Sequence, residues 1–159
     1  MAEARAPSPR PFRTPGPEAS VTTARDLMTA DVRCIPATET LDRAAQLMRD
    51  HGIGALPVKG SEGELAGIVT DRDIVVRALA AGKDAAKVTA GDLAEGGVHT
   101  VDAGADASLA VKAMSEARIR RIVVVEDGTP VGMITEADLA RKLPAEAFSS
   151  YASRVYAAS

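Results

Sequence analysis

The chain has 159 residues, which is enough for one compact domain or for two small half-domains that share a core. Its net charge of −3 and its pI near 5.4 argue against a general nucleic-acid-binding protein, which needs a basic surplus. No apolar run approaches the roughly 20 residues that cross a bilayer, and one cysteine excludes an internal disulfide. We therefore expect no nucleic-acid and no membrane partner, and a cytoplasmic location.

The chain begins with a segment rich in proline and alanine, residues 1–22, which we expect to be disordered because it has little apolar material to bury. A first unit is predicted over residues 23–82. Its helix shows the clearest pattern, because the apolar residues at the i, i+3, i+4, i+7 spacing of one buried stripe are Leu41, Ala44, Ala45 and Met48. The predicted elements are a strand over 32–35, a helix over 40–51, strands over 55–59 and 65–70, and a helix over 71–81.

A linker over residues 83–87 leads to a second unit over 88–144 that repeats this order. Aligning the chain with itself at an offset of 66 residues, and later 65, pairs Met48 with Met114 and preserves the order of all matches. The predicted elements are a strand over 98–101, a helix with Asp106 as its N-cap, strands over 122–126 and 131–135, and a helix over 136–143. The sequence therefore predicts an α/β (α+β) fold of two β-α-β-β-α repeats.

A three-stranded sheet cannot bury both of its faces alone, so we expect the repeats to pack sheet to sheet with pseudo-two-fold symmetry. The helix over 71–81 keeps further apolar residues, namely Ile74, Val75, Ala78 and Leu79. They either cover the sheet or form a homodimer through the repeat helices. The last segment, 145–159, is predicted to be an amphipathic helix with Phe148, Tyr151, Val155 and Tyr156 on one face. It either docks on its own chain or acts as an arm on a partner.

One short motif occurs twice, as GIVTDRDI from Gly67 to Ile74 and as GMITEADL from Gly132 to Leu139. Each copy places Thr-x-x-Asp where a strand ends and a helix begins, and that pattern alone predicts a capping box. The motif also has a preceding glycine, a second equivalent copy and a helix N-terminus that suits phosphate. We therefore interpret it as a pair of ligand anchors, with helix capping as the alternative.

With these motifs and spacings, the chain resembles a tandem pair of cystathionine-β-synthase (CBS) domains, a Bateman module, over roughly Thr23 to Leu143. The resemblance implies a regulatory protein that binds AMP, ADP or ATP in clefts between the repeats and acts as an energy or metabolite sensor for an unidentified protein. In this family the Asp binds ribose and the Thr or Ser meets phosphate. The implied first cleft contains Thr70, Arg72, Asp73, Val98, His99, Ile119 and Arg121, and the second contains Val32, Arg33, Ile53, Gly54, Thr135 and Asp138, with Arg120 nearby.

The two implied clefts differ in charge. Arg118, Arg120 and Arg121 stand in the second unit where the first has glycine or alanine, and Arg72 has no cationic counterpart. We predict that the cleft with Thr70 and its arginines binds a phosphate-bearing ligand more tightly than the other.

Three other interpretations are weighed against the nucleotide sensor. An enzyme lacks support, because the two histidines and Cys34 have no catalytic context and no phosphate-binding Walker loop occurs, so we predict no catalytic residue. We also predict no metal site and no tightly bound cofactor, and expect Cys34 to be a small hydrophobic residue on a core strand. A structural or protein-interaction module with degenerate pockets, or a binder of S-adenosylmethionine, remains the alternative.

Overall fold

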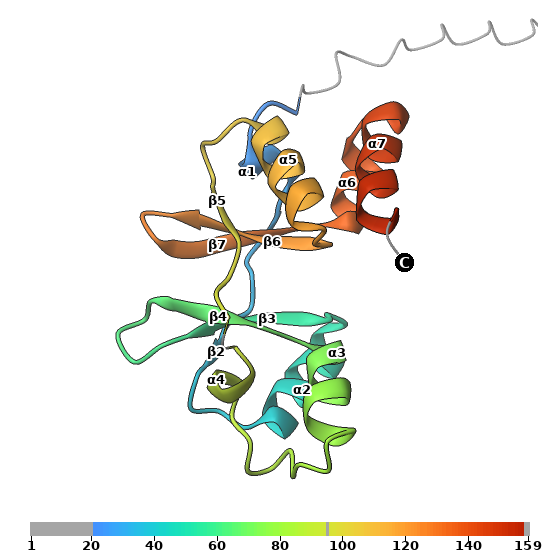
Figure 1. Ribbon diagram of the computed structural model, residues 1–159. Helices are drawn as coiled ribbons and strands as arrows, with labels where there is room; N and C mark the ends of the chain where they lie inside the picture. Colours follow the sequence, from blue (N-terminus) through green and yellow to red (C-terminus); the bar gives the residue numbers. More distant parts are fainter. Residues whose placement is uncertain (1–20, 95, 158–159) are drawn as a thin grey trace, which may run out of the picture.

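Two β-sheets lie face to face at the centre of the molecule, and helices cover their outer sides (Figure 1). The computed structural model describes residues 21–94 and 96–157, so nearly all of the predicted N-terminal tail lies outside the described part. Ala55, Val123 and Met133 are buried between the sheets, where only aliphatic side chains meet. The three-stranded sheet has the order β2 (Ile35–Pro36), β3 (Ala55–Lys59) and β4 (Leu65–Thr70), and the four-stranded sheet has the order β1 (Thr29–Ala30), β7 (Thr129–Thr135), β6 (Arg121–Glu126) and β5 (Thr100–Asp102).

The two halves repeat one arrangement, in which an antiparallel hairpin is joined on one side by a short parallel strand. Of the predicted stripe, Leu41, Ala44 and Met48 are buried as expected, whereas Ala45 is exposed. Asp106 is confirmed as an N-cap, since its Oδ1 accepts a hydrogen bond from the Ser108 amide at 2.8 Å. The helices are α1 (Ala24–Leu27), α2 (Leu41–His51), α3 (Asp71–Asp73), the π-helix η1 (Ile74–Leu79), α4 (Ala90–Leu93), α5 (Ala107–Ala117), α6 (Glu136–Lys142) and α7 (Ala145–Tyr156).

The first strand of each repeat was predicted too early in the chain. Residues 32–34 are not in a strand, and β2 begins only at Ile35, because Asp31 adopts a left-handed conformation with φ 57° and ends the extended run after β1. The prediction that Cys34 lies on a core strand is therefore wrong, and this residue is half-buried in the loop. The helix predicted over 71–81 is also not uniform, because η1 widens to a π-type turn with the Ala80 amide donating to the Val75 carbonyl at 2.8 Å.

Each repeat exchanges its first helix with the other repeat. Helix α1 contributes Leu27 to the core of the second half, and α4 contributes Leu93 to the core of the first half. The sequence did not predict either of these four-residue helices. We call α1 and α4 the exchanged helices, and because of them the predicted units over 23–82 and 88–144 divide the sequence but not the two cores.

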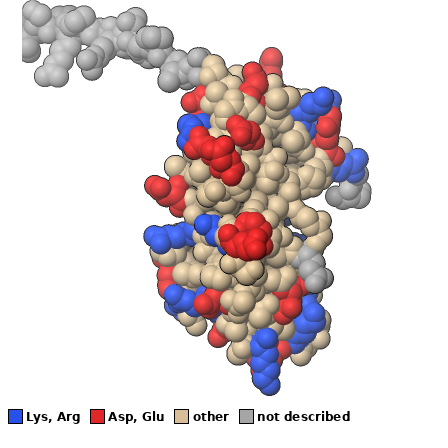
Figure 2. Space-filling model, turned by 90° about the vertical axis from the view of Figure 1, so that its left-hand side faces the viewer, with Lys and Arg blue, Asp and Glu red and all other residues tan. Residues whose placement is uncertain are grey.

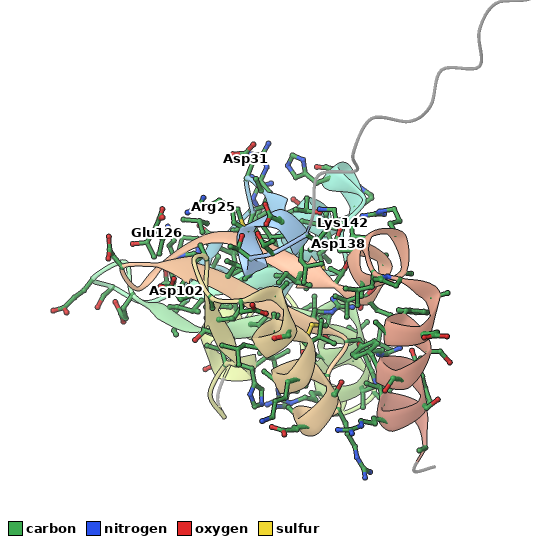
Figure 3. All side chains as sticks on the ribbon, turned by 90° about the horizontal axis from the view of Figure 1, so that it is seen from above. Arg25, Asp31, Asp102, Glu126, Asp138 and Lys142 are labelled. Atoms are coloured by element: carbon green, nitrogen blue, oxygen red, sulfur yellow. The ribbon has the colours of Figure 1, made fainter. Side chains whose placement is uncertain are left out.

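The repeated glycine of the motif makes room for the exchange. A Cβ on Gly67 would lie 2.3 Å from the Ala94 carbonyl oxygen, and a Cβ on Gly132 would lie 2.4 Å from the Met28 sulfur. A cation from the helix after each motif then caps the exchanged helix in the same way. The Lys142 ammonium donates to the Leu27 carbonyl at 3.0 Å beside α1 (Figure 3), and the Arg77 guanidinium donates to the Leu93 carbonyl at 2.7 Å.

The C-terminal helix α7 docks on its own chain, against α5 and α6 (Figure 1). Tyr151 is 1% exposed, and its hydroxyl donates to the Ile119 carbonyl at 3.0 Å. Phe148 and Val155 pack against the same core. Of the two alternatives left open by the sequence, the structure therefore shows docking in cis. Within the described residues, no helix combines the length and apolar character that crossing a membrane requires.

Candidate functional site

A first cleft of about 300 Å³ opens at the seam between the two halves, beside the end of β4. This volume is at the lower end of those of small-molecule sites. The end of β4 supplies Thr70 from one half, and the segment before β6 supplies Ile119 from the other. The lining residues are Ile68, Thr70, Asp71, Arg72, Gly97, Val98, His99, Arg118, Ile119, Arg120, Arg121 and Val123.

Thr70, which lines this cleft, forms the predicted capping box with Asp73, which does not line it. The Asp73 Oδ2 atom accepts hydrogen bonds from the Thr70 amide at 3.0 Å and from the Thr70 hydroxyl at 2.7 Å. The other carboxylate oxygen, Oδ1, has only a long contact of 3.8 Å with Arg77, and the side chain keeps 27% of its exposure. Capping therefore leaves one Asp73 oxygen available to accept further hydrogen bonds.

Positive charge dominates the first cleft, because four arginines face it and Asp71 is the one carboxylate among its lining residues. Arg121 is held in place by donating from Nη1 to the Gly54 carbonyl at 2.9 Å. The same carbonyl accepts from the Asp71 amide at 3.1 Å, so one backbone oxygen joins the two halves at this point. A cluster of guanidinium groups on a fixed backbone suits an anion with several oxygens.

A second cleft of about 320 Å³ lies at the equivalent place beside the end of β7. Its lining carries less positive charge than that of the first cleft, because the charge of Asp31 offsets that of Arg33. Its other arginine, Arg121, is shared between the two clefts. The lining residues are Thr29, Ala30, Asp31, Val32, Arg33, Gly52, Ile53, Gly54, Ala55, Arg121, Met133 and Thr135.

Asp138, the counterpart of Asp73, is closed off from its cleft. The side chain is 1% exposed, and its Oδ2 accepts from the Thr135 amide at 2.9 Å and from the Thr135 hydroxyl at 2.8 Å. Its Oδ1 is also occupied, because it accepts from the Thr29 hydroxyl at 3.0 Å and from Arg141 at 2.5 Å. A ribose that bound Asp138 would have to displace Thr29 and Arg141.

The structure groups most of the predicted site residues as the sequence did, with three differences. Asp73 and Asp138 stand behind their threonines and are not among the residues that line either cleft. Arg120 was predicted near Thr135, but it lines the first cleft, because its side chain leaves the segment before β6 on that side. The sequence reasoning missed Asp71, which follows Thr70 directly, and Thr29, for which the sequence held no signal.

The described residues hold no group of three or more His, Cys, Asp or Glu side chains placed to bind a metal ion. Burial raises the pKa of the Cys34 thiol, and the nearby Lys59 opposes this only in part. The thiol therefore stays protonated at neutral pH and is a poor nucleophile. His99 lines the first cleft, and no cysteine is among the described residues that line it.

The fold and the two clefts at the seam define the class of protein. The family model described as the CBS domain matches residues 24–79 and 90–145, so the chain belongs to the CBS domain family and contains two CBS domains. The chain is 47% identical over 131 residues to Hypoxic response protein 1 of Mycobacterium tuberculosis, covering 82% of this chain and 92% of that protein. It is 35% identical over 120 residues to the CBS domain-containing protein YhcV of Bacillus subtilis, covering 73% of this chain and 81% of the relative.

Solved structures agree with this assignment. The crystal structure of Hypoxic Response Protein I with two coordinated zinc ions has a TM-score of 0.70 and 49% identity, covering 77% of this chain and all of that one. A CBS domain protein of unknown function from Thermoplasma acidophilum, TA0289, has a TM-score of 0.73 and 22% identity, covering 83% of this chain and 75% of that one, and so shows the fold alone.

Proposed function

We propose that this protein is a regulatory CBS pair that binds an adenine nucleotide in the first cleft, the one lined by Thr70 and the arginines. One observation carries the proposal, namely the unequal state of the two aspartates. Asp73 keeps a carboxylate oxygen free beside an arginine-lined cavity, whereas Asp138 is buried with both oxygens in use. A carboxylate accepts hydrogen bonds from both hydroxyls of a ribose.

The charge of the first cleft favours AMP, ADP or ATP over S-adenosylmethionine. Phosphate oxygens suit Arg118, Arg120 and Arg121, while the sulfonium cation of S-adenosylmethionine would be repelled by the same groups. The adenine would rest on aliphatic side chains such as Val98 and Ile119, since no Phe, Tyr or Trp is among the described residues that line the cleft. No reaction is proposed, because the one hydroxyl bound to a carboxylate in the first cleft, that of Thr70, belongs to a capping box with Asp73.

A regulatory role requires that ligand binding change the contact between this protein and a partner. Val75, Val76 and Leu79 on the α3–η1 helix are 55%, 48% and 54% exposed, and we propose that a second copy of the chain covers them in a homodimer. On the other half α7 already covers the helices, so the dimer uses the first half. A ligand that binds the monomer and the homodimer with unequal affinity then shifts the equilibrium between them, or changes the contact with a regulated protein. We place this regulation in the cytoplasm.

Zinc is not proposed as the ligand of this chain. One related crystal structure is described with two coordinated zinc ions, but the residues described here assemble no group that fits such a site. Zinc chloride is nevertheless included among the ligands in the binding experiment that follows.

The proposal is tested by isothermal titration of the full chain with AMP, ADP, ATP, S-adenosylmethionine and zinc chloride. Asp73→Asn removes a charged acceptor at the open site, so we expect nucleotide affinity to fall roughly 10- to 100-fold. Asp138→Asn is the matched control, and it should leave that affinity unchanged. Equal losses in the two variants would contradict the assignment of the first cleft.

A thermal-shift series separates the remaining alternatives. A nucleotide present at 100 times its Kd should stabilise the fold by about 2.7 kcal/mol, which for a chain of this size raises the melting temperature by roughly 5–10 °C. No shift with any nucleotide would favour a structural module with degenerate pockets. Chromatography of the same mixtures tests the absence of an enzymatic reaction, because any new product would contradict it.

A further inference from the structure

The two motif aspartates are capped alike, and they differ in the second oxygen of the carboxylate. In both repeats, Oδ2 accepts hydrogen bonds from the amide and the hydroxyl of the motif threonine. The Oδ1 atom of Asp73 makes a long contact of 3.8 Å with Arg77. The Oδ1 atom of Asp138 accepts from the Thr29 hydroxyl at 3.0 Å and from the Arg141 guanidinium at 2.5 Å. Asp138 is therefore closed by two side chains that lie outside the motif.

Both closing side chains lie at the surface of the molecule. Thr29 is exposed and lines the second cleft, and the Arg141 side chain is 64% exposed. The Asp138 carboxylate, which accepts from both, is 1% exposed. The groups that occupy Oδ1 can therefore be removed one at a time without altering the buried core.

The described part of the first repeat has no equivalent of either group. The offset of 65 residues that aligns the two motifs places Val76 where Arg141 stands, and valine has no side-chain donor. Thr29 belongs to β1, which pairs with β7 and is the strand that the four-stranded sheet has in addition to the arrangement common to both sheets. The difference between the two aspartates can thus be traced to two side chains.

We propose that Thr29 and Arg141 are specificity-determining residues that keep ribose out of the second cleft, and that they limit the chain to one nucleotide. This inference rests on the proposed nucleotide function of the first cleft. A ribose hydroxyl can reach Oδ1 of Asp138 only in place of the two donors. Without them Asp138 would have a capped Oδ2 and an available Oδ1, which is the state of Asp73.

The second cleft is otherwise suited to a nucleotide. Its volume of about 320 Å³ is close to the 300 Å³ of the first cleft, and Arg33 and Arg121 are among its lining residues. Because Asp31 reduces its positive charge, we expect a second nucleotide to bind more weakly than the first. On the face that carries the two hairpin turns, acidic side chains gather beside the seam (Figure 2), so a second nucleotide is not drawn to that face.

The test counts the AMP molecules bound per chain by isothermal titration of the full chain. The wild type should bind one, and the Thr29→Ala/Arg141→Val double variant should bind two. Since hydrogen bonds to a charged group no longer have to be displaced, AMP affinity at the second cleft should rise roughly 10- to 100-fold. Thr29→Ser/Arg141→Lys is the matched control, because it keeps a donor at both positions, and it should bind one.

Further substitutions assign each bound AMP to a cleft. Adding Asp138→Asn to the Thr29→Ala/Arg141→Val protein should abolish the second, weaker binding event and leave the first unchanged. Adding Asp73→Asn should weaken the tighter event and leave the second. A non-specific second event would instead persist in both proteins.

Folding is checked on the same samples by far-ultraviolet circular dichroism, because the double variant loses two hydrogen bonds of a buried carboxylate. If it does not fold, Arg141→Val alone serves as the test, since it removes one exposed donor. This single variant should show a second binding event of lower affinity than the one expected for the double variant.

The outcomes distinguish the two proposals. If the wild-type chain binds no nucleotide, the proposed function fails, and the inference falls with it. If the wild type and the folded Thr29→Ala/Arg141→Val protein both bind one AMP, the inference alone is overturned. It is also overturned if the wild type binds two and Asp138→Asn removes one of them, because Thr29 and Arg141 would then not exclude ribose.

Discussion

Replacing the motif aspartate by alanine should destabilise the two repeats unequally. Asp73→Ala removes only the capping interaction of a partly exposed carboxylate, which costs about 1 kcal/mol. Asp138→Ala removes the same cap and in addition the two bonds that the Asp138 carboxylate, itself 1% exposed, accepts from the Thr29 hydroxyl and from Arg141. Because hydrogen bonds to a charged group contribute about 1.5–3 kcal/mol, we expect a total loss of about 3 kcal/mol.

Urea unfolding followed by far-ultraviolet circular dichroism measures this difference, provided that the slope of the transition stays constant between variants. Thr29→Val is an informative control, because it removes one of the extra bonds and should cost about 1 kcal/mol. Losses for Asp73→Ala and Asp138→Ala within about 0.5 kcal/mol of each other would refute the reasoning, since the two sites would then be energetically equivalent.

Three further changes test the packing and the charges. Gly67→Ala should destabilise the fold by about 1–3 kcal/mol in urea unfolding, since its Cβ meets the Ala94 carbonyl, whereas Gly104→Ala, with 3.3 Å to its nearest neighbour, should cost less. Lys142→Met removes the cation that caps α1 and should lower the melting temperature by a few degrees. In 1 M salt this decrease should be no larger, because salt screens the charge of the lysine. Hydrogen bonds from Thr23 and Thr22 lower the pKa of Asp26 from 3.8 to about 2, so the stabilisation it provides is present above pH 4 and is lost as the pH falls toward 2. The melting temperature of Asp26→Asn should therefore fall less than that of the wild type over this range, and equal falls would contradict the assignment.

Much of the fold could be predicted because its signals are local. The stripe of Leu41, Ala44 and Met48 and the turn at Asp127–Gly128 each depend on residues close in sequence. The Thr-x-x-Asp motifs are also local, and both are confirmed as capping boxes. Binding of a ligand by the same motifs stays a prediction.

The features that escaped prediction depend on contacts between distant segments. The burial of Asp138 needs the Thr29 hydroxyl, and the sequence has no signal that brings these two residues together. The exchanged helices are four residues long, which is too short for a periodic pattern. The loop that contains Cys34 was read as a strand because the left-handed conformation of Asp31 is not visible in its neighbours.

The exchanged helices also bear on how such a chain is assembled and how it can be recombined. During synthesis, Leu27 is among the first described residues to be made, yet it packs in the same core as Leu139, near the end of the second repeat. The core of the second half is therefore completed only when almost the whole chain is available. A chimera that joins repeats from two relatives would have to take α1 from the donor of the second repeat and α4 from the donor of the first. Crossovers placed at the repeat boundary would leave Leu27 and Leu93 against foreign cores, and β1 pairs with β7 of the second half. The working boundaries for exchange therefore lie after Ala30 and after Ala94.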